Sequence, residues 1–404
     1  MSDDAFTREL GLLEATSIGL GTMIGGGIFI LPSIAATRAG PASAVSFVLA
    51  GLVSLLSAAS HAEVATDMQD SEGGGYQYVH RALGPLFGTV VGWGMLLGFV
   101  FATAFYAVGF AEYLRYVVAT VPIPLLAGAL AVVLVGLNLY GAAEAGWLED
   151  AIVATLLVLV VGFVALGATT TGTVYVTFVG FSVIATATAE IENPTHNLPL
   201  SMAVAVLVPT VLYALVMVVS IGVLPAEELQ GSTVPVADVA QVFAGGIGAL
   251  TMVVGAVLAT VSSANASILG AGRVSYAMGE DRTLSDWLSR LHDRFETPYR
   301  AILLTGVGIL ALVAAGVAID VLAEIASFLF LLTYGMVHIA VIRLRGRDGY
   351  DPAFAIPDPL YPAVPVVGLL ATVVIMTQMT PVVVAGGLAV VAASVGWYVV
   401  VVRE

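Results

Sequence analysis

The stretch GTMIGGGIFIL, Gly21 to Leu31, lies in the middle of an apolar run and carries three consecutive glycines, Gly25 to Gly27. A glycine in a helix interior costs about 1 kcal/mol relative to alanine. Inside a bilayer, a backbone N–H or C=O group without a partner costs several kcal/mol more. Adjacent glycines point around the whole helix, whereas small residues that pack helices together follow one face. We therefore predict a broken helix whose backbone groups are open to a ligand.

The composition of the whole chain is that of a membrane protein. Of the 404 residues, 59% are hydrophobic and 10% are charged, and the mean hydropathy is +1.02. A soluble protein of this balance would have too little polar surface to face water, whereas runs of about 20 apolar residues cross a hydrocarbon core of ~30 Å. We predict about twelve such spans, in a single domain over residues 1–404: 15–36, 42–66, 86–110, 121–140, 150–168, 172–192, 201–224, 243–268, 300–318, 321–342, 362–379 and 381–401.

The arginines predict how the chain is oriented. All 13 basic residues are arginine, and 28 acidic residues bring the formal net charge to −15. With the N-terminus inside, every arginine except Arg38 and Arg115 lies on the cytoplasmic side, which is the asymmetry expected of a cell-membrane protein. We therefore predict that both termini are cytoplasmic.

The same composition bears on habitat and chemistry. An acidic surface without lysine favours solubility at high salt, which indicates a halophilic source. GC-rich codon usage would produce the same bias, so both explanations stay open. The absence of cysteine excludes disulfides and thiolate chemistry. No nucleic-acid partner is expected, and the sequence leaves the oligomeric state open.

A second interruption predicts internal symmetry. Transporters with inverted repeats often open each repeat with a helix that is broken near the bilayer midplane. The sixth apolar run places Gly180 and Ser182 in mid-span, where the matching interruption is expected. This predicts two five-span repeats, about 11–168 and 172–345, followed by two further spans at about 360–402.

The predicted break offers two kinds of binding group. The half-helix that begins near Gly26 directs its free N–H groups and positive dipole end towards the cavity, which favours a carboxylate. The freed carbonyls before the break, at Thr22 and Met23, favour an ammonium group or a cation. One break thus supplies donors for one end of a zwitterion and acceptors for the other.

Four segments resemble the amino acid–polyamine–organocation (APC) permeases. The segment LLEATSIGLGTMIGGGIFILP, residues 12–32, is similar to their first helix, and residues 59–85 to their second helix and the loop after it. Residues 180–202 resemble helix 6 and its exit, and residues 262–302 resemble the end of helix 8 and the next loop. The resemblance covers about residues 11–345 and implies the all-α, LeuT-type fold of twelve transmembrane helices.

The resemblance also implies amino acid transport by alternating access, with defined substrate contacts. The substrate carboxylate would meet the N–H groups of Gly26 and Gly27, and the amine would meet the carbonyl of Met23. Many relatives carry a small hydroxyl residue at the position of Gly26, so the carboxylate loses one side-chain hydrogen bond here. The predicted substrate-binding set is Met23, Gly25, Gly26, Gly27, Phe178, Val179, Gly180 and Ser182.

The sixth span would supply the rest of the amine site and the gate. Carbonyls of Phe178 and Val179 would complete the contacts to the amine. Relatives often carry an aromatic lid where this chain has Val176, so the usual gate is altered. Another aromatic residue would then cover the substrate: Tyr175, Phe178 or Phe181.

A cation site is predicted between the first and eighth spans. Thr260, Ser262 and Ser263 would supply hydroxyls, and carbonyls near Gly19 and Thr22 would supply the other ligands. In related folds this region holds Na⁺, and some APC members place a lysine there, a residue that this chain lacks. The alternative is that the hydroxyls bond carbonyls of their own preceding turn. No cofactor other than Na⁺ is expected.

We predict structural roles for two polar residues of the spans. Glu63 ends the second span, where we expect a solvated helix end in preference to a proton relay. His338 lies within the tenth span, where we expect hydrogen-bonded packing. No cluster of polar catalytic groups lies within the spans, so no enzymatic activity is predicted.

The sequence therefore predicts a secondary active amino acid transporter, coupled to Na⁺ or H⁺. Exchange of one amino acid for another remains an alternative, as does a carrier of amines or polyamines, which would need a further acid facing the site. A membrane-embedded sensor that binds an amino acid without moving it is the third alternative. Selectivity depends on the shape of the pocket, so the amino acid itself is left open.

Overall fold

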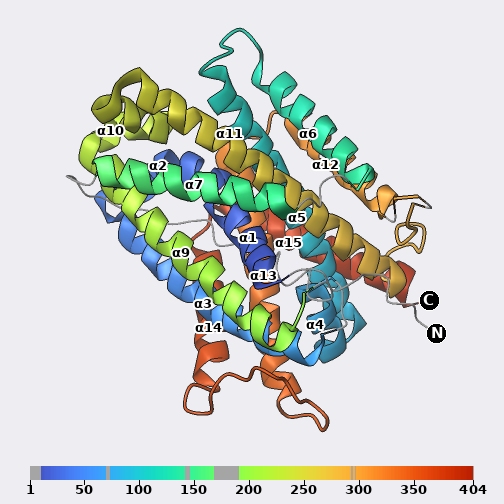
Figure 1. The fold of residues 1–404 in the computed structure, drawn as a ribbon. Helices are drawn as coiled ribbons and strands as arrows, with labels where there is room; N and C mark the ends of the chain where they lie inside the picture. Colours follow the sequence, from blue (N-terminus) through green and yellow to red (C-terminus); the bar gives the residue numbers. More distant parts are fainter. Residues whose placement is uncertain are drawn as a thin grey trace.

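The computed structural model describes residues 11–69, 73–141, 146–167, 191–292, 294–295 and 297–403. Within these ranges the regular structure is built from helices (Figure 1). In chain order they are α1 (Leu12–Ile24), α2 (Gly26–Ala39), α3 (Ser43–Asp67), α4 (Gly75–Leu83), α5 (Pro85–Arg115), α6 (Ile123–Leu139), α7 (Gly146–Gly167), α9 (Pro194–Val223), α10 (Ala226–Gln230), α11 (Pro235–Glu280), α12 (Tyr299–Ala314), α13 (Ile319–Leu344), α14 (Ala363–Thr377) and α15 (Pro381–Trp397).

The lengths of these helices agree with a multi-pass membrane protein. Eight helical stretches of the described chain are long and apolar enough to cross a membrane, one of them being α1 together with α2. Three shorter apolar helices, α6, α12 and α14, coincide with other predicted spans. The predicted span 172–192 lies almost entirely outside the described residues. An all-helical membrane fold is thereby confirmed, while the number of twelve helices and the two repeats stay predictions.

The predicted break in the first span is present. α1 ends at Ile24 and α2 begins at Gly26, while Gly25 between them has a ψ of −154°, far from the helical value. A Cβ atom on Gly25 would lie 1.5 Å from the Ser263 hydroxyl oxygen of α11. Glycine is therefore required at this position by the close approach of α11.

A long, kinked helix brings its polar residues to this break. α11 has 46 residues and leaves helical geometry at Gly245, whose φ of 63° is readily adopted only by glycine. It packs against α5, α7, α2 and α1. Hydroxyl groups from the middle of α11 therefore lie beside the broken helix.

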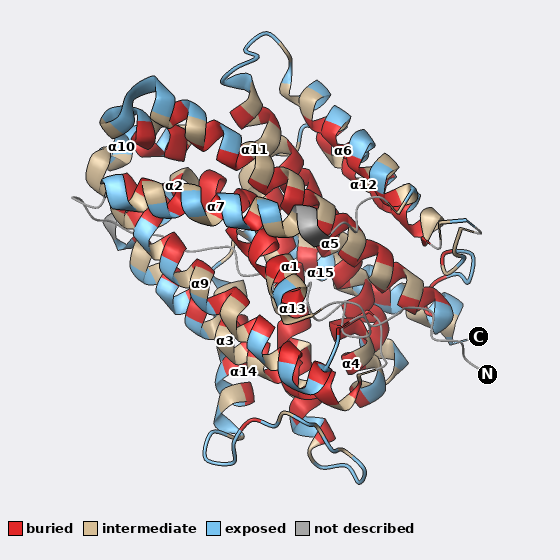
Figure 2. Ribbon diagram, viewed as in Figure 1, coloured by how far each residue is buried: buried red, intermediate tan, exposed pale blue. Residues whose placement is uncertain are grey.

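Burial distinguishes the central helices from the peripheral ones (Figure 2). In the most apolar part of the first span 83% of residues are buried, against 17% in the last span. Large apolar side chains on outer helices are exposed, among them Val158 (72%), Ile247 (83%) and Val382 (73%). Lipid would cover such surfaces in a membrane. The break in the first span is therefore enclosed by protein, which is where interrupted backbone is tolerated.

Candidate functional site

The broken helix forms the centre of the candidate substrate site. The Gly26 N–H group donates a hydrogen bond to the Ser263 hydroxyl oxygen at 3.3 Å, and this oxygen lies 3.3 Å from the Thr22 carbonyl oxygen. The Tyr213 hydroxyl of α9 donates to the Met23 carbonyl oxygen at 2.9 Å. Side chains of α11 and α9 therefore satisfy backbone groups that the break leaves open.

The space around Gly26 is tight. An added Cβ atom would lie 2.6 Å from Thr260 Cγ2 and 2.9 Å from Tyr106 Cδ1. The Tyr106 side chain, which comes from α5, also interacts with Ser263, and Gly27 is buried beside them. In this conformation α5 and α11 close the predicted carboxylate site.

The hydroxyl groups of the predicted cation site have two kinds of hydrogen-bond partner. The Thr260 hydroxyl donates to carbonyl oxygens of its own helix at 2.7 and 3.0 Å, and the Thr22 hydroxyl does the same in α1 at 2.7 Å. The Ser262 hydroxyl, in contrast, donates to the Glu149 carboxylate of α7, and Gly19 is buried within α1. The two serines of the set thus contact another helix, whereas the two threonines bond their own.

Three residues at this centre were not predicted from the sequence. Glu149 was missed because the apolar run was expected to begin at residue 150, which placed the carboxylate in a loop. Its position at the membrane end of a span was the available signal. Tyr106 and Tyr213 lie within apolar runs, where nothing distinguishes a tyrosine that bonds a distant carbonyl from one that fills space.

The part of the site that the sixth span was expected to supply lies outside the described residues. The contacts to the amine and the identity of the gate therefore stay predictions. The residues concerned are Tyr175, Val176, Phe178, Val179, Gly180, Phe181 and Ser182.

Glu63 contradicts the expectation of a solvated helix end. Its side chain is fully buried and accepts hydrogen bonds from Arg345 Nε at 2.7 Å and Arg345 Nη2 at 2.8 Å. The Ile356 N–H group at 2.8 Å and the Tyr350 hydroxyl at 3.3 Å complete the set. The carboxylate raises the pKa of Arg345 through these hydrogen bonds. The expectation was wrong because the loop between α13 and α14 folds over the end of α3 and excludes water.

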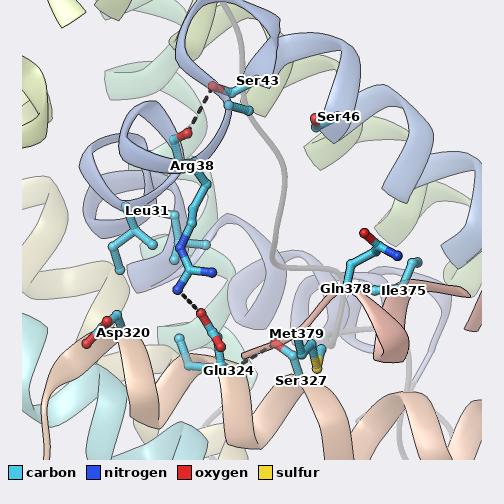
Figure 3. Close-up of a pocket in the computed structure, with 14 residues that line it drawn as sticks. Leu31, Arg38, Ser43, Ser46, Asp320, Glu324, Ser327, Ile375, Gln378 and Met379 are labelled. Atoms are coloured by element: carbon cyan, nitrogen blue, oxygen red, sulfur yellow. Dashed lines mark hydrogen bonds and ion pairs between the residues drawn. The ribbon is translucent and has the colours of Figure 1, made fainter. Parts of the chain in front are cut away.

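An ion pair also lies at the opposite end of the bundle, in a pocket (Figure 3). Arg38 at the end of α2 pairs with Glu324 of α13, and the Thr380 hydroxyl donates to the same carboxylate at 2.9 Å. The pocket has a volume of about 220 Å³ and is mostly apolar, with Asp320 and Gln378 among its polar residues. Arg38 and Glu324 point toward each other across it (Figure 3).

His338 has the packing role that was predicted. Its Nδ1 lies 2.9 Å from the Ser60 hydroxyl and its Nε2 lies 3.2 Å from the Ser57 hydroxyl. A Cβ atom on Gly368 would lie 2.2 Å from the imidazole ring, so α14 packs directly against it. The prediction of hydrogen-bonded packing is confirmed, and the ring joins α3, α13 and α14.

Comparison with known proteins agrees with this architecture. The family model described as amino acid permease matches residues 10–173 and 165–402, which is nearly the whole chain. The chain belongs to the amino acid permease family. The resemblance inferred from the four segments is thereby confirmed, and the family implies a membrane protein with an amino acid as its small-molecule substrate.

Individual relatives in the family carry different descriptions. An uncharacterized transporter of Mycobacterium tuberculosis is 32% identical to this permease over 98% of the chain and 91% of its own length. A branched-chain amino acid permease of Bacillus subtilis is 28% identical, over 91% of the chain and 87% of its own length. A methylthioribose transporter of the same organism is 29% identical, over 90% and 86%. Similarity over nearly whole lengths indicates one shared architecture, whereas the names of the relatives differ in substrate.

Proposed function

We propose that this permease is a secondary active transporter that moves amino acids across the cell membrane by alternating access, coupled to Na⁺ or H⁺. The observation that carries the proposal is the broken first span, where backbone groups that leave the helical pattern are hydrogen-bonded by side chains of α9 and α11. Its expected architecture is the LeuT-type fold with repeats at about 11–168 and 172–345 and two further spans at about 360–402. A membrane protein that only binds lipid has no need of such a break.

The groups that now occupy the break indicate where the substrate binds. The Ser263 oxygen accepts from the Gly26 N–H group, as a substrate carboxylate would. The Tyr213 hydroxyl donates to the Met23 carbonyl, as a substrate ammonium would. A zwitterion that replaced both contacts would keep the Gly26 N–H group and the Met23 carbonyl hydrogen-bonded. The sixth span would contribute the remaining contacts from Phe178 to Ser182, including the gate.

The arginines support a cytoplasmic location for both termini. Arg347 donates to the carbonyl oxygens of Arg81 and Ala82, so the ends of α13 and α4 that carry these arginines lie together. Arg38 lies at the opposite end of the bundle. With the arginine-rich end inside, the loop 276–300 is cytoplasmic. A cysteine introduced by Ser285→Cys should resist an impermeant reagent added to sealed cells, and labelling from outside would contradict this orientation.

The proposal is tested with purified protein in proteoliposomes and a panel of labelled solutes. The panel contains neutral, branched-chain, cationic and acidic amino acids, a polyamine and methylthioribose. We expect concentrative uptake of at least one amino acid when an ion gradient is imposed. Uptake that requires amino acid on the far side would indicate an exchanger, and binding without uptake would indicate a sensor.

The role of the break is tested by Gly26→Val. The added side chain would overlap Thr260 and Tyr106 and fill the carboxylate site, so we expect amino acid binding to be lost while the protein stays in the membrane. The matched control is Gly136→Val in α6, because a Cβ atom there meets open space. Unchanged substrate affinity in Gly26→Val would exclude these N–H groups as the carboxylate site.

A further inference from the structure

The pocket at the Arg38 end of the bundle combines apolar walls with a few charged groups (Figure 3). It has a volume of about 220 Å³ and is formed by α2, α3, α13 and the end of α14. Leu31 and Ile34 of α2 and Met379 after α14 supply apolar surface. A concave, mostly apolar space with few polar groups is the usual form of a small-molecule site. The pocket therefore has the form of a binding site, and its lining residues are distinct from those around the break at Gly25.

The charges that line the pocket do not balance. The Arg38 guanidinium pairs with the Glu324 carboxylate, which also accepts the Thr380 hydroxyl at 2.9 Å. Asp320 lies one turn before Glu324 on the same face of α13 and lines the same pocket. Over the described residues, neither an ion pair nor a hydrogen bond engages the Asp320 carboxylate. Two carboxylates thus accompany one guanidinium, and like charges at this spacing repel each other, so a bound cation would be stabilised.

The walls of the pocket favour an organic cation over a metal ion. Hard metal ions bind where several oxygen atoms surround one point, whereas side chains such as Ile34 and Ile375 present carbon to this space. A molecule with an apolar body and one charged end matches apolar walls beside one carboxylate that lacks a partner.

The same walls indicate which type of organic cation fits. The lining residues include no aromatic ring, so the cation–π contacts that hold quaternary ammonium groups are missing from this site. A protonated amine instead donates N–H hydrogen bonds to a carboxylate, and such charge-assisted bonds are strong. The Ser327 hydroxyl donates to the Ala323 carbonyl at 2.7 Å, which leaves its oxygen able to accept a further N–H group. The lining therefore favours a primary ammonium group.

We propose that this pocket binds a small alkylammonium ion, with Asp320 as its charged partner and the apolar side chains of Leu31, Ile34 and Met379 around its alkyl body. Figure 3 shows Asp320 and Glu324 projecting from α13 beside these apolar walls. The binding of the amine does not depend on the proposed transport function, since the pocket is separate from the break.

The position of the pocket gives the bound amine a regulatory effect. α2 begins at Gly26, at the predicted carboxylate site, and also forms one wall of the pocket opposite α13. A ligand seated between the two helices stabilises the arrangement in which they lie together. The amine should therefore lower the maximal rate of amino acid uptake without competing for the substrate site. This consequence alone rests on the proposed function.

The test measures amine binding to the full-length protein in detergent, with isopentylamine as the probe. Its hydrochloride replaces choline chloride at constant ionic strength and neutral pH, and binding is followed by calorimetry and by the thermal midpoint. We expect a saturable rise of the midpoint in the wild type. Asp320→Asn keeps the shape of the side chain but removes its charge, and should weaken binding by roughly tenfold or more.

Two other compounds and two further variants test the chemistry of the site. Isopentanol has the same alkyl body without the charge, and tetramethylammonium has the charge without an N–H group, so neither should produce the response. Ala323→Leu fills the pocket without changing a charge and should also abolish amine binding. The matched control is Glu227→Gln, because Glu227 is an exposed carboxylate of α10, which packs against α2 but does not line the pocket. If Asp320→Asn fails to fold, Ala323→Leu decides the test.

The outcomes distinguish this inference from the proposed function. The inference is wrong if the wild type gives no saturable response, if isopentanol or tetramethylammonium gives the same response, or if Asp320→Asn binds the amine like the wild type. It is also wrong if Gly26→Val abolishes the response while Asp320→Asn retains it, since the amine would then bind at the break. Amino acid uptake in any of these cases would leave the proposed function standing. Amine binding that depends on Asp320, in a protein that moves no amino acid, would support the pocket and contradict the proposed function.

Discussion

The two ends of the bundle are each closed by an arginine–carboxylate pair, but in different environments. At the arginine-rich end, Glu63 is fully buried and receives hydrogen bonds from Arg345, Tyr350 and the Ile356 backbone. At the opposite end, the side chains of Arg38 and Glu324 are 48% and 18% exposed and border a cavity. Breaking a buried pair leaves an uncompensated charge, whereas an exposed pair is screened by water.

The two ion pairs differ in how many further contacts accompany them. The buried pair fastens an entire loop, between α13 and α14, onto α3, and Arg345 also stacks on the Tyr361 ring at 4.1 Å. The pair of Arg38 and Glu324 joins the ends of α2 and α13, and among the described residues the Thr380 hydroxyl adds a hydrogen bond to the Glu324 carboxylate. Separating Glu63 from Arg345 therefore requires several buried contacts to break together, while Arg38 and Glu324 form a pair that water partly reaches.

The largest effect is expected from Glu63→Gln. It leaves the Arg345 guanidinium with only the exposed Asp358 carboxylate, 3.6 Å away, and breaking a buried pair from one side costs about 3–5 kcal/mol. The measurement is the unfolding midpoint of the purified protein in detergent. The double variant Glu63→Gln/Arg345→Met should regain part of the loss, because the unpaired charge is removed. A loss no greater than that of Arg38→Gln would contradict the contrast between the ends.

An intermediate effect is expected at the break between the two ends. Ser263→Ala removes the acceptor of the Gly26 N–H group, and a buried group left unsatisfied costs about 1–3 kcal/mol. The matched control is Ser267→Ala, since the buried Ser267 hydroxyl donates only within its own helix, to the Ser263 carbonyl. The same unfolding measurement compares the two variants. If both variants lost the same stability, the hydrogen bond between Gly26 and Ser263 would contribute no more than a hydrogen bond within one helix.

The arginine-rich end should also respond to acid through Asp281. Burial acts to raise the pKa of Asp281, but hydrogen bonds from His80, Tyr76 and Gln77 and the charge of His80 lower it below its usual 3.8. This stabilisation is complete above the usual pKa and is lost as the pH falls through the lowered value.

The prediction is a loss of stability in acid that depends on Asp281. The wild-type unfolding midpoint should fall more steeply below the usual carboxyl pKa than that of Asp281→Asn. At neutral pH the wild type should be the more stable of the two. Parallel pH curves for the two proteins would show that these contacts between α4 and the end of α11 contribute nothing measurable.

The smallest effect is expected from Arg38→Gln. An exposed ion pair contributes about 0–1 kcal/mol, and salt reduces it further. Unfolding at low and high NaCl should show a small loss that shrinks as salt rises. If Arg38→Gln lost as much stability as Glu63→Gln, the pair of Arg38 and Glu324 would stabilise the protein as strongly as the pair of Glu63 and Arg345, which would contradict the contrast.

Much of the architecture could be predicted because it depends on short stretches of sequence. Apolar runs are local, and the candidate membrane-crossing helices of the described chain overlap predicted spans. The glycines at the break are also local, and the break lies where they predicted it. What could not be predicted was the partner of each polar group. Glu63 was expected in water because Arg345, 282 residues away, gives no local signal.

The sequence by itself determined that this protein spans a membrane with helices and that the first span is interrupted at Gly25. Solvation explains this, since a bilayer demands apolar residues and satisfied backbone groups along each span. The tertiary structure alone decided which side chains satisfy the interruption. Ser263 reaches Gly26 across 237 residues, and Glu149 reaches Ser262 across 113. Hydrogen bonds form between groups that packing brings within about 3 Å, and the order of residues along the chain does not encode that distance locally.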